Sequence, residues 1–169
     1  MDKTTVTKDF ENKKLVIDRA LDAPAAKVWR AYAEKDLFVK WWGPEGWETT
    51  VTEFEFQPGG RNHYCMKCVD EGQGEFFGQE SWGLMEYTAI EDGVRIEYID
   101  SFSDADGNKQ DGMPNLRCVV EFVESDGTTH LVSTIYGDTA EEIEKLIEMG
   151  MIEGFDSSAN KLEALAQTL

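Results

Sequence analysis

The sequence predicts an α+β fold in which one curved antiparallel sheet wraps around a long C-terminal helix. Three observations predict this class. Strand-like segments fill the chain from residue 48 to residue 136, two short helical segments precede them, and residues 139–169 lack proline and carry apolar residues at helical spacing. Strands that are followed by one helix pack most simply as a single sheet covered by that helix.

The first strand is predicted at residues 13–21, and two short helices follow at 25–33 and 37–42. Asp22 and Pro24 suit the start of the first helix, and Gly43-Pro44 ends the second. Further strands are predicted at 49–56, 62–69, 81–90, 94–102, 116–124 and 128–136. We treat residues 1–12 as an N-terminal extension and residues 13–169 as a single domain.

Residues 139–169 are predicted to form one long helix, which begins with the capping-box spacing of Thr139 and Glu142. One apolar stripe runs along it, made of Ile143, Ile147, Met151, Phe155, Leu162 and Leu165. Gly150 and Gly154 lie on or beside this stripe. A glycine inside a helix costs about 1 kcal/mol relative to alanine. Two of them on the buried side indicate either a close backbone approach or unfilled space, and we interpret them as one wall of an internal cavity.

Composition excludes several classes of function. The 169 residues include 16 basic and 34 acidic side chains, for a net charge of −18, so neither nucleic acid nor an anionic membrane is an expected partner. The acidic surface supports solubility or docking to a basic partner surface. The N-terminus lacks the apolar core of a signal peptide and no apolar run is long enough to cross a bilayer, which predicts a cytoplasmic protein. The three cysteines are expected to be reduced thiols.

No catalytic, metal or cofactor site is predicted. His63 and Cys65 share one face of a predicted strand, whereas Cys68 points to the other face, and no second pair completes a zinc site. The chain contains no nucleophile elbow and no phosphate-binding glycine loop. An enzyme of the cyclase or hydratase type stays an alternative. It requires a titratable group with a strongly shifted pKa inside the cavity.

Successive side chains of a strand point to opposite faces of the sheet, so the sequence predicts which side chains face the C-terminal helix. A register slip of one residue would turn these side chains to the other face. The residues predicted to line a ligand cavity are Asn62, Tyr64, Met66, Trp82, Met85, Tyr87, Tyr98, Cys118, Met151 and Phe155. Trp41 and Trp42 are further candidates for its rim or wall. Apolar walls with a few hydrogen-bonding groups are typical of ligand sites. An ordinary filled core is the alternative interpretation.

Several motifs together resemble a known family. They are the segment 19–29, Trp41-Trp42-Gly43-Pro44, Pro58-Gly59-Gly60-Arg61, Trp82-Gly83 with Tyr87, 101–104, 127–129 and 150–165. In this order they resemble the SRPBCC (START-like) superfamily, and within it the branch related to the activator of the 90-kDa heat-shock protein ATPase. The resemblance implies a helix-grip fold with a cavity between sheet and helix, and it carries over no catalytic residue. Asn62 stands where the family commonly has a bulky aromatic residue, and residues 73–80 resemble an insertion.

We therefore expect a protein that binds a small hydrophobic or amphipathic molecule, without a cofactor and without a defined catalytic activity. The alternatives are a co-chaperone-like module that contacts a chaperone or another basic protein surface, and the enzyme named above. Exposed strand edges are compatible with a homodimer.

Overall fold

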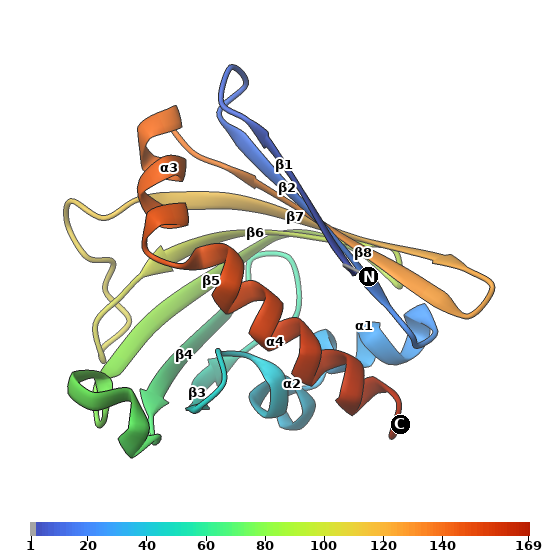
Figure 1. The fold of residues 1–169 in the computed structure, drawn as a ribbon, viewed down its shortest axis with the longest axis horizontal. Helices are drawn as coiled ribbons and strands as arrows, with labels where there is room; N and C mark the ends of the chain where they lie inside the picture. Colours follow the sequence, from blue (N-terminus) through green and yellow to red (C-terminus); the bar gives the residue numbers. More distant parts are fainter. Residues whose placement is uncertain (1–2) are drawn as a thin grey trace.

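A computed structural model describes residues 3–169 and shows an eight-stranded antiparallel sheet with helices packed on its inner face (Figure 1). The elements in chain order are β1 (Thr4–Asp9), β2 (Lys14–Leu21), α1 (Ala25–Ala33), α2 (Lys35–Trp41), β3 (Trp47–Phe54), β4 (Arg61–Cys68), the 3-10 helix η1 (Glu71–Phe76), β5 (Glu80–Glu91), β6 (Arg95–Phe102), β7 (Asn115–Ser125), β8 (Thr128–Tyr136), α3 (Ala140–Glu148) and α4 (Met151–Ala166). The strand order is β1-β2-β8-β7-β6-β5-β4-β3, so the sheet is curved but not closed and β1 and β3 form its edges.

The predicted strands all form, and their ends differ from the prediction by at most two residues. The predicted register is also confirmed where strands pair. Tyr98 lies opposite Cys118, and Val120 lies opposite Ser133, so these side chains share the inner face. Alternating apolar residues produce this result because successive side chains of a strand point to opposite faces.

The N-terminal segment takes part in the sheet. Residues 4–9, which lie in the segment that we treated as an extension, form β1 and pair with β2 from Thr4 opposite Arg19 to Asp9 opposite Lys14. Lys13, with φ of 56°, closes the turn between the two strands. The sheet therefore begins before residue 13.

The prediction of one helix over residues 139–169 is wrong, because the chain turns at Met149-Gly150 and forms α3 and α4. Gly150 has φ of +93°, which is a left-handed conformation that glycine adopts without steric cost. The Gly150 amide donates to the carbonyl of Ile147, so this glycine ends α3 rather than sitting inside a helix. After the turn, α4 crosses the inner face of the sheet diagonally, whereas α3 lies near one end of it (Figure 1).

Arg19 fixes the position of α4 relative to β2. Its side chain is 2% exposed and donates to Asp156 (3.3 Å), Asn160 (2.8 Å) and Glu163 (3.4 Å) of α4. Burial raises the pKa of Glu163, but hydrogen bonds from Lys3 and from the Asp22 amide, together with the charges of Lys3 and Arg19, lower it below its ordinary value. These contacts hold one side of α4 on the sheet.

The C-terminal half of α4 is packed, and helices α1 and α2 fill that end of the inner face. Trp29 of α1 packs edge-to-face against Phe56 and Phe122, with ring centroids 5.7 Å and 5.0 Å apart. Ala159, Leu162 and Ala166 of α4 are buried there. The architecture is an α+β helix-grip fold, as the resemblance implied. No helix within residues 3–169 has the length and apolar character needed to span a membrane.

Candidate functional site

A cavity of about 380 Å³ lies between the inner face of the sheet and the N-terminal half of α4. Its floor comes from strands β4 to β8, its roof from α4 and the turn before it, and its side from the end of α2. The lining residues are mostly apolar or aromatic: Tyr32, Trp41, Trp42, Gly43, Pro44, Tyr64, Met66, Ser81, Trp82, Gly83, Tyr98, Asp100, Ser101, Phe102, Leu116, Cys118, Leu131, Ser133, Ile135, Leu146, Met149, Gly150, Met151, Gly154, Phe155, Ser158, Ala159 and Leu162. Such a volume is within the range of about 300–1,000 Å³ found for small-molecule sites.

Small residues on part of the side of α4 that faces the sheet leave room for the cavity. Gly154, Ser158 and Ala159 line its roof. A Cβ atom added at Gly154 would have no heavy atom within 4 Å, so the space below this position is open. Arg19 holds α4 on its other side, and the helix does not settle further onto the sheet. Gly154 therefore marks unfilled space, as the glycine spacing suggested, although Gly150 has a different role.

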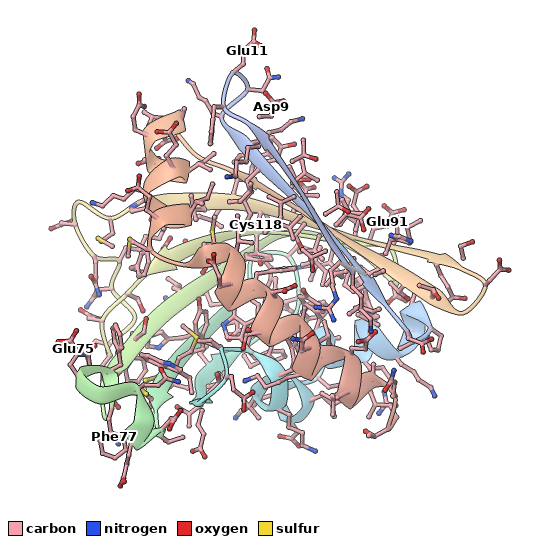
Figure 2. All side chains as sticks on the ribbon, viewed as in Figure 1. Asp9, Glu11, Glu75, Phe77, Glu91 and Cys118 are labelled. Carbon is pink, nitrogen blue, oxygen red and sulfur yellow. The ribbon has the colours of Figure 1, made fainter. Side chains whose placement is uncertain are left out.

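Seven of the ten predicted cavity residues border this space: Tyr64, Met66, Trp82, Tyr98, Cys118, Met151 and Phe155. Trp82 lies opposite Cys65, on the other face of the sheet from Tyr64, so its indole packs beside His63 and does not form part of the inner wall. Figure 2 shows Cys118 near the middle of the molecule, on the strands behind the turn between α3 and α4. Trp41 and Trp42 also line the cavity.

Asn62, Met85 and Tyr87 lie on the inner face of the sheet but are not among the lining residues. Asn62 donates to the Tyr87 hydroxyl at 3.3 Å and to the Met85 sulfur at 3.5 Å. The Tyr87 ring packs on Phe56, at 5.1 Å between centroids. These three side chains thus belong to the filled end of the core, next to α1.

The His63 region forms a separate cluster. The His63 ring packs beside the indole of Trp82 at 5.0 Å, and its two nitrogens contact Thr52 (2.7 Å) and the Asp104 carbonyl (3.0 Å). The three cysteines are free and buried. Within residues 3–169, no group of three His, Cys, Asp or Glu side chains is arranged to hold a metal ion.

Among the lining residues that the sequence analysis did not name, Asp100 is the charged one. It is the one charged side chain among the lining residues, and the Tyr64 hydroxyl donates to its carboxylate at 3.1 Å. Burial raises the pKa of Asp100 from 3.8 to about 7, and the hydrogen bond from Tyr64 opposes this rise. Its side chain stays partly accessible because it faces the cavity. An acidic residue two positions after Tyr98, on the otherwise apolar inner face of β6, was the available signal.

The other titratable groups of the cavity are uncharged at neutral pH. Burial raises the pKa of Tyr64 and of Tyr98 well above the ordinary value, and the nearby Asp100 charge acts in the same direction. Burial also raises the pKa of the Cys118 thiol, so it is not a reactive thiolate. The site therefore combines apolar walls, several hydroxyl groups and one carboxyl group.

The accessible lining residues mark the mouth of the cavity. Met149 is 61% exposed, and Pro44, Met66 and Met151 are partly exposed. They belong to the turn before α4, the segment after α2 and the strand β4. At the closed end, Tyr32, Leu131 and Leu162 are buried.

Comparisons with known proteins agree with this architecture. The family described as Activator of Hsp90 ATPase homolog 1-like protein matches residues 22–167. A crystal structure of a protein from Mycobacterium smegmatis is 31% identical, with 96% of each chain covered and a TM-score of 0.84. A solution structure from Staphylococcus epidermidis is 30% identical, covers 98% of this chain and 95% of the other, and has a TM-score of 0.81. A solution structure of a protein from Arthrobacter aurescens is 27% identical, covers 98% of this chain and 92% of the other, and has a TM-score of 0.85. No functionally curated protein matches the sequence.

Proposed function

The chain belongs to the family of Activator of Hsp90 ATPase homolog 1-like proteins, a branch of the SRPBCC superfamily, and we propose that it binds a small hydrophobic or amphipathic molecule. The molecule would lie between the sheet and α4, without a cofactor and without a defined reaction. The observation that carries this proposal is the open space beneath Gly154, within a cavity of about 380 Å³.

The driving force would be burial of apolar ligand surface. Each 100 Å² of apolar area removed from water contributes about 2.5 kcal/mol. Aromatic walls from Trp42, Tyr98 and Phe155 suit a flat or branched apolar body. Polar groups of the cavity, such as Tyr64, Asp100 and Ser133, would orient the ligand. This combination favours an amphipathic molecule over a pure hydrocarbon.

A thermal-shift screen of uncharged, naphthalene-sized compounds tests the proposal, together with native mass spectrometry of the freshly purified protein. We expect compounds that fit the cavity to raise the melting temperature in a concentration-dependent way, because a ligand that binds only the folded state stabilises it. If no compound shifts the melting temperature and no small molecule copurifies, the proposal is wrong.

Binding to a partner protein is a second candidate function, favoured by two exposed phenylalanine side chains at the end of η1. Phe76 and Phe77 are 49% and 48% exposed and lie next to acidic residues such as Glu75. In Figure 2, Phe77 projects from η1 away from the body of the protein. These residues lie in the segment 73–80, which resembles an insertion. Purified Hsp90, the partner that the family description names, should then bind in a salt-dependent way and bind the Phe77→Ser variant less tightly. Equal binding of the variant would count against this candidate.

One observation supports the enzyme alternative, which requires a titratable group with a strongly shifted pKa inside the cavity. Asp100 is such a group. A carboxyl group with a pKa of about 7 can both accept and donate a proton at neutral pH. However, within residues 3–169 the cavity lining offers no other charged group as its partner. Ligand binding is therefore the function that the geometry supports best.

A further inference from the structure

Asp100 places a single acidic group in a cavity that is otherwise uncharged. Within residues 3–169, no lysine, arginine or histidine nitrogen forms an ion pair with its carboxylate, although nine other ion pairs are present. A carboxylate without a cationic partner is costly inside a protein. The side chain also faces the space that the proposed ligand would occupy.

The hydrogen-bonding capacity of Asp100 is mostly unused. Its two oxygens offer about four acceptor positions when ionised. In the described part of the chain, the Tyr64 hydroxyl is the one donor to this side chain. The remaining positions can accept N–H groups from a bound molecule.

Aromatic side chains lie near Asp100, since Tyr64 bonds it and Trp42 packs against Tyr64. The rings of Trp42 and Tyr64 lie 5.5 Å apart, and Tyr98 precedes Asp100 by two residues on the same face of β6. The faces of such rings attract cations, and the attraction grows when the cation is removed from water. The net charge of −18 also raises the concentration of organic cations near the surface.

We infer that the preferred ligand is an amphipathic amine. Its protonated nitrogen pairs with Asp100 and contacts the aromatic faces of Trp42 and Tyr98, while its apolar body lies under α4 at Gly154. This inference rests on the proposed function and specifies its ligand class. The Tyr64 hydroxyl would hold the carboxylate in place for the amine.

The surroundings of Asp100 determine how this pairing depends on pH. The titratable groups that face it are Tyr64 from β4, Tyr98 from its own strand and Cys118 from β7, and burial keeps all three uncharged at pH 8. None of the α4 residues that line the cavity carries a charge: they are Met151, Gly154, Phe155, Ser158, Ala159 and Leu162. Protonation of Asp100 alone should therefore weaken amine binding as the pH falls below about 7.

Three compounds with the same ring system test the inference: 2-naphthylmethylamine, 2-naphthalenemethanol and 2-naphthoate, titrated calorimetrically at pH 8. We expect the amine to bind the wild-type protein at least tenfold more tightly than the alcohol, and the naphthoate to bind most weakly. In Asp100→Asn, which keeps the shape of the side chain, the amine and the alcohol should bind equally. Glu91→Gln removes the same charge from the exposed end of β5 and should behave as the wild type.

The outcomes separate the two proposals. Equal binding of amine and alcohol to the wild-type protein, or an amine preference that persists in Asp100→Asn, overturns the inference and leaves the binding function standing. Failure of all three compounds to bind overturns both. The pH dependence gives a second test on the unmodified protein, since the amine preference should decrease between pH 8 and pH 5.5 while binding of the alcohol stays constant. A preference that does not change with pH contradicts the role of Asp100.

Discussion

The hydroxyl of Tyr64 donates a 3.1 Å hydrogen bond to the carboxylate of Asp100, although one whole strand lies between them. Tyr64 belongs to β4 and Asp100 to β6, and Gly83 of the intervening strand β5 lies directly opposite Tyr64. A Cβ atom at Gly83 would overlap the ring and the hydroxyl of Tyr64. The absence of a side chain at Gly83 therefore allows the tyrosine to lie across β5 and reach the carboxyl group.

Gly83→Ala should displace the Tyr64 ring and break this hydrogen bond. We expect a loss of about 1–3 kcal/mol of stability, as for other overpacked cores. Since the hydrogen bond lowers the pKa of Asp100, that pKa should rise in the variant. Chemical denaturation and an NMR titration of the Asp100 carboxyl carbon measure the two effects. An unchanged pKa would show that Tyr64 does not stabilise the ionised form.

Asp100→Asn should change how stability depends on pH. The pKa of Asp100 is higher in the folded state than in the unfolded state, so its favourable contribution is present below about pH 4 and is lost as the pH rises through about 7. The shift from 3.8 to about 7 sets an upper limit of about 4 kcal/mol on this loss. The variant should therefore be as stable as the wild type near pH 4 and more stable at pH 8. Urea denaturation at both pH values checks this, and a wild-type protein that is more stable than the variant at pH 8 would contradict it.

Arg19 should be essential for holding α4 on the sheet. Arg19→Met removes the buried guanidinium that bonds Asp156, Asn160 and Glu163 together, and it leaves Lys3 as the one cation that contacts Glu163 in the described part of the chain. Breaking a buried ion pair in this way costs about 3–5 kcal/mol. The matched control is Arg30→Met, because Arg30 of α1 and Glu34, which follows that helix, form an exposed pair whose loss should have little effect on stability. Equal effects of the two substitutions in denaturation experiments would exclude the anchoring role of Arg19.

Substitution of alanine for Gly150 and for Gly154 should have opposite effects on the stability of the protein. Gly150→Ala places a side chain at φ of +93°, which should destabilise the protein by about 1–2 kcal/mol. Gly154 lies inside α4 above open space, so Gly154→Ala should stabilise by about 0.5–1 kcal/mol. Melting temperatures of the two variants measure the difference. A stabilising Gly150→Ala would show that α3 and α4 can join into one helix.

Alternation along the strands was sufficient to predict most of the fold and the inner face of the sheet. Tyr64, Tyr98 and Cys118 lie where the pattern placed them, because a half-buried antiparallel strand carries a clear period of two. The helix break was not predicted, since helical spacing continues through Gly150 and only its positive φ reveals the turn.

The extent of the cavity could not be predicted from local patterns. Asn62, Met85 and Tyr87 satisfy the same alternation as the lining residues, but Phe56 and Trp29 cover that end of the sheet. Those contacts join segments that are remote in sequence. Asp100 could have been found, because its strand alternates Ile96, Tyr98, Asp100 and Phe102 on one face. An acidic group in that series was a signal for a site, which the search for apolar side chains overlooked.

The central claim is that the space between the sheet and α4 accepts an apolar molecule, and a matched titration tests it most directly. The uncharged fluorophore N-phenyl-1-naphthylamine would be titrated into the wild-type protein and into Gly154→Leu, which adds a bulky side chain at a position that lines the cavity. We expect saturable binding of one fluorophore per wild-type chain, and loss of binding in a variant that keeps its melting temperature. Absence of binding to the wild-type protein, or equal binding to both proteins, would contradict the account.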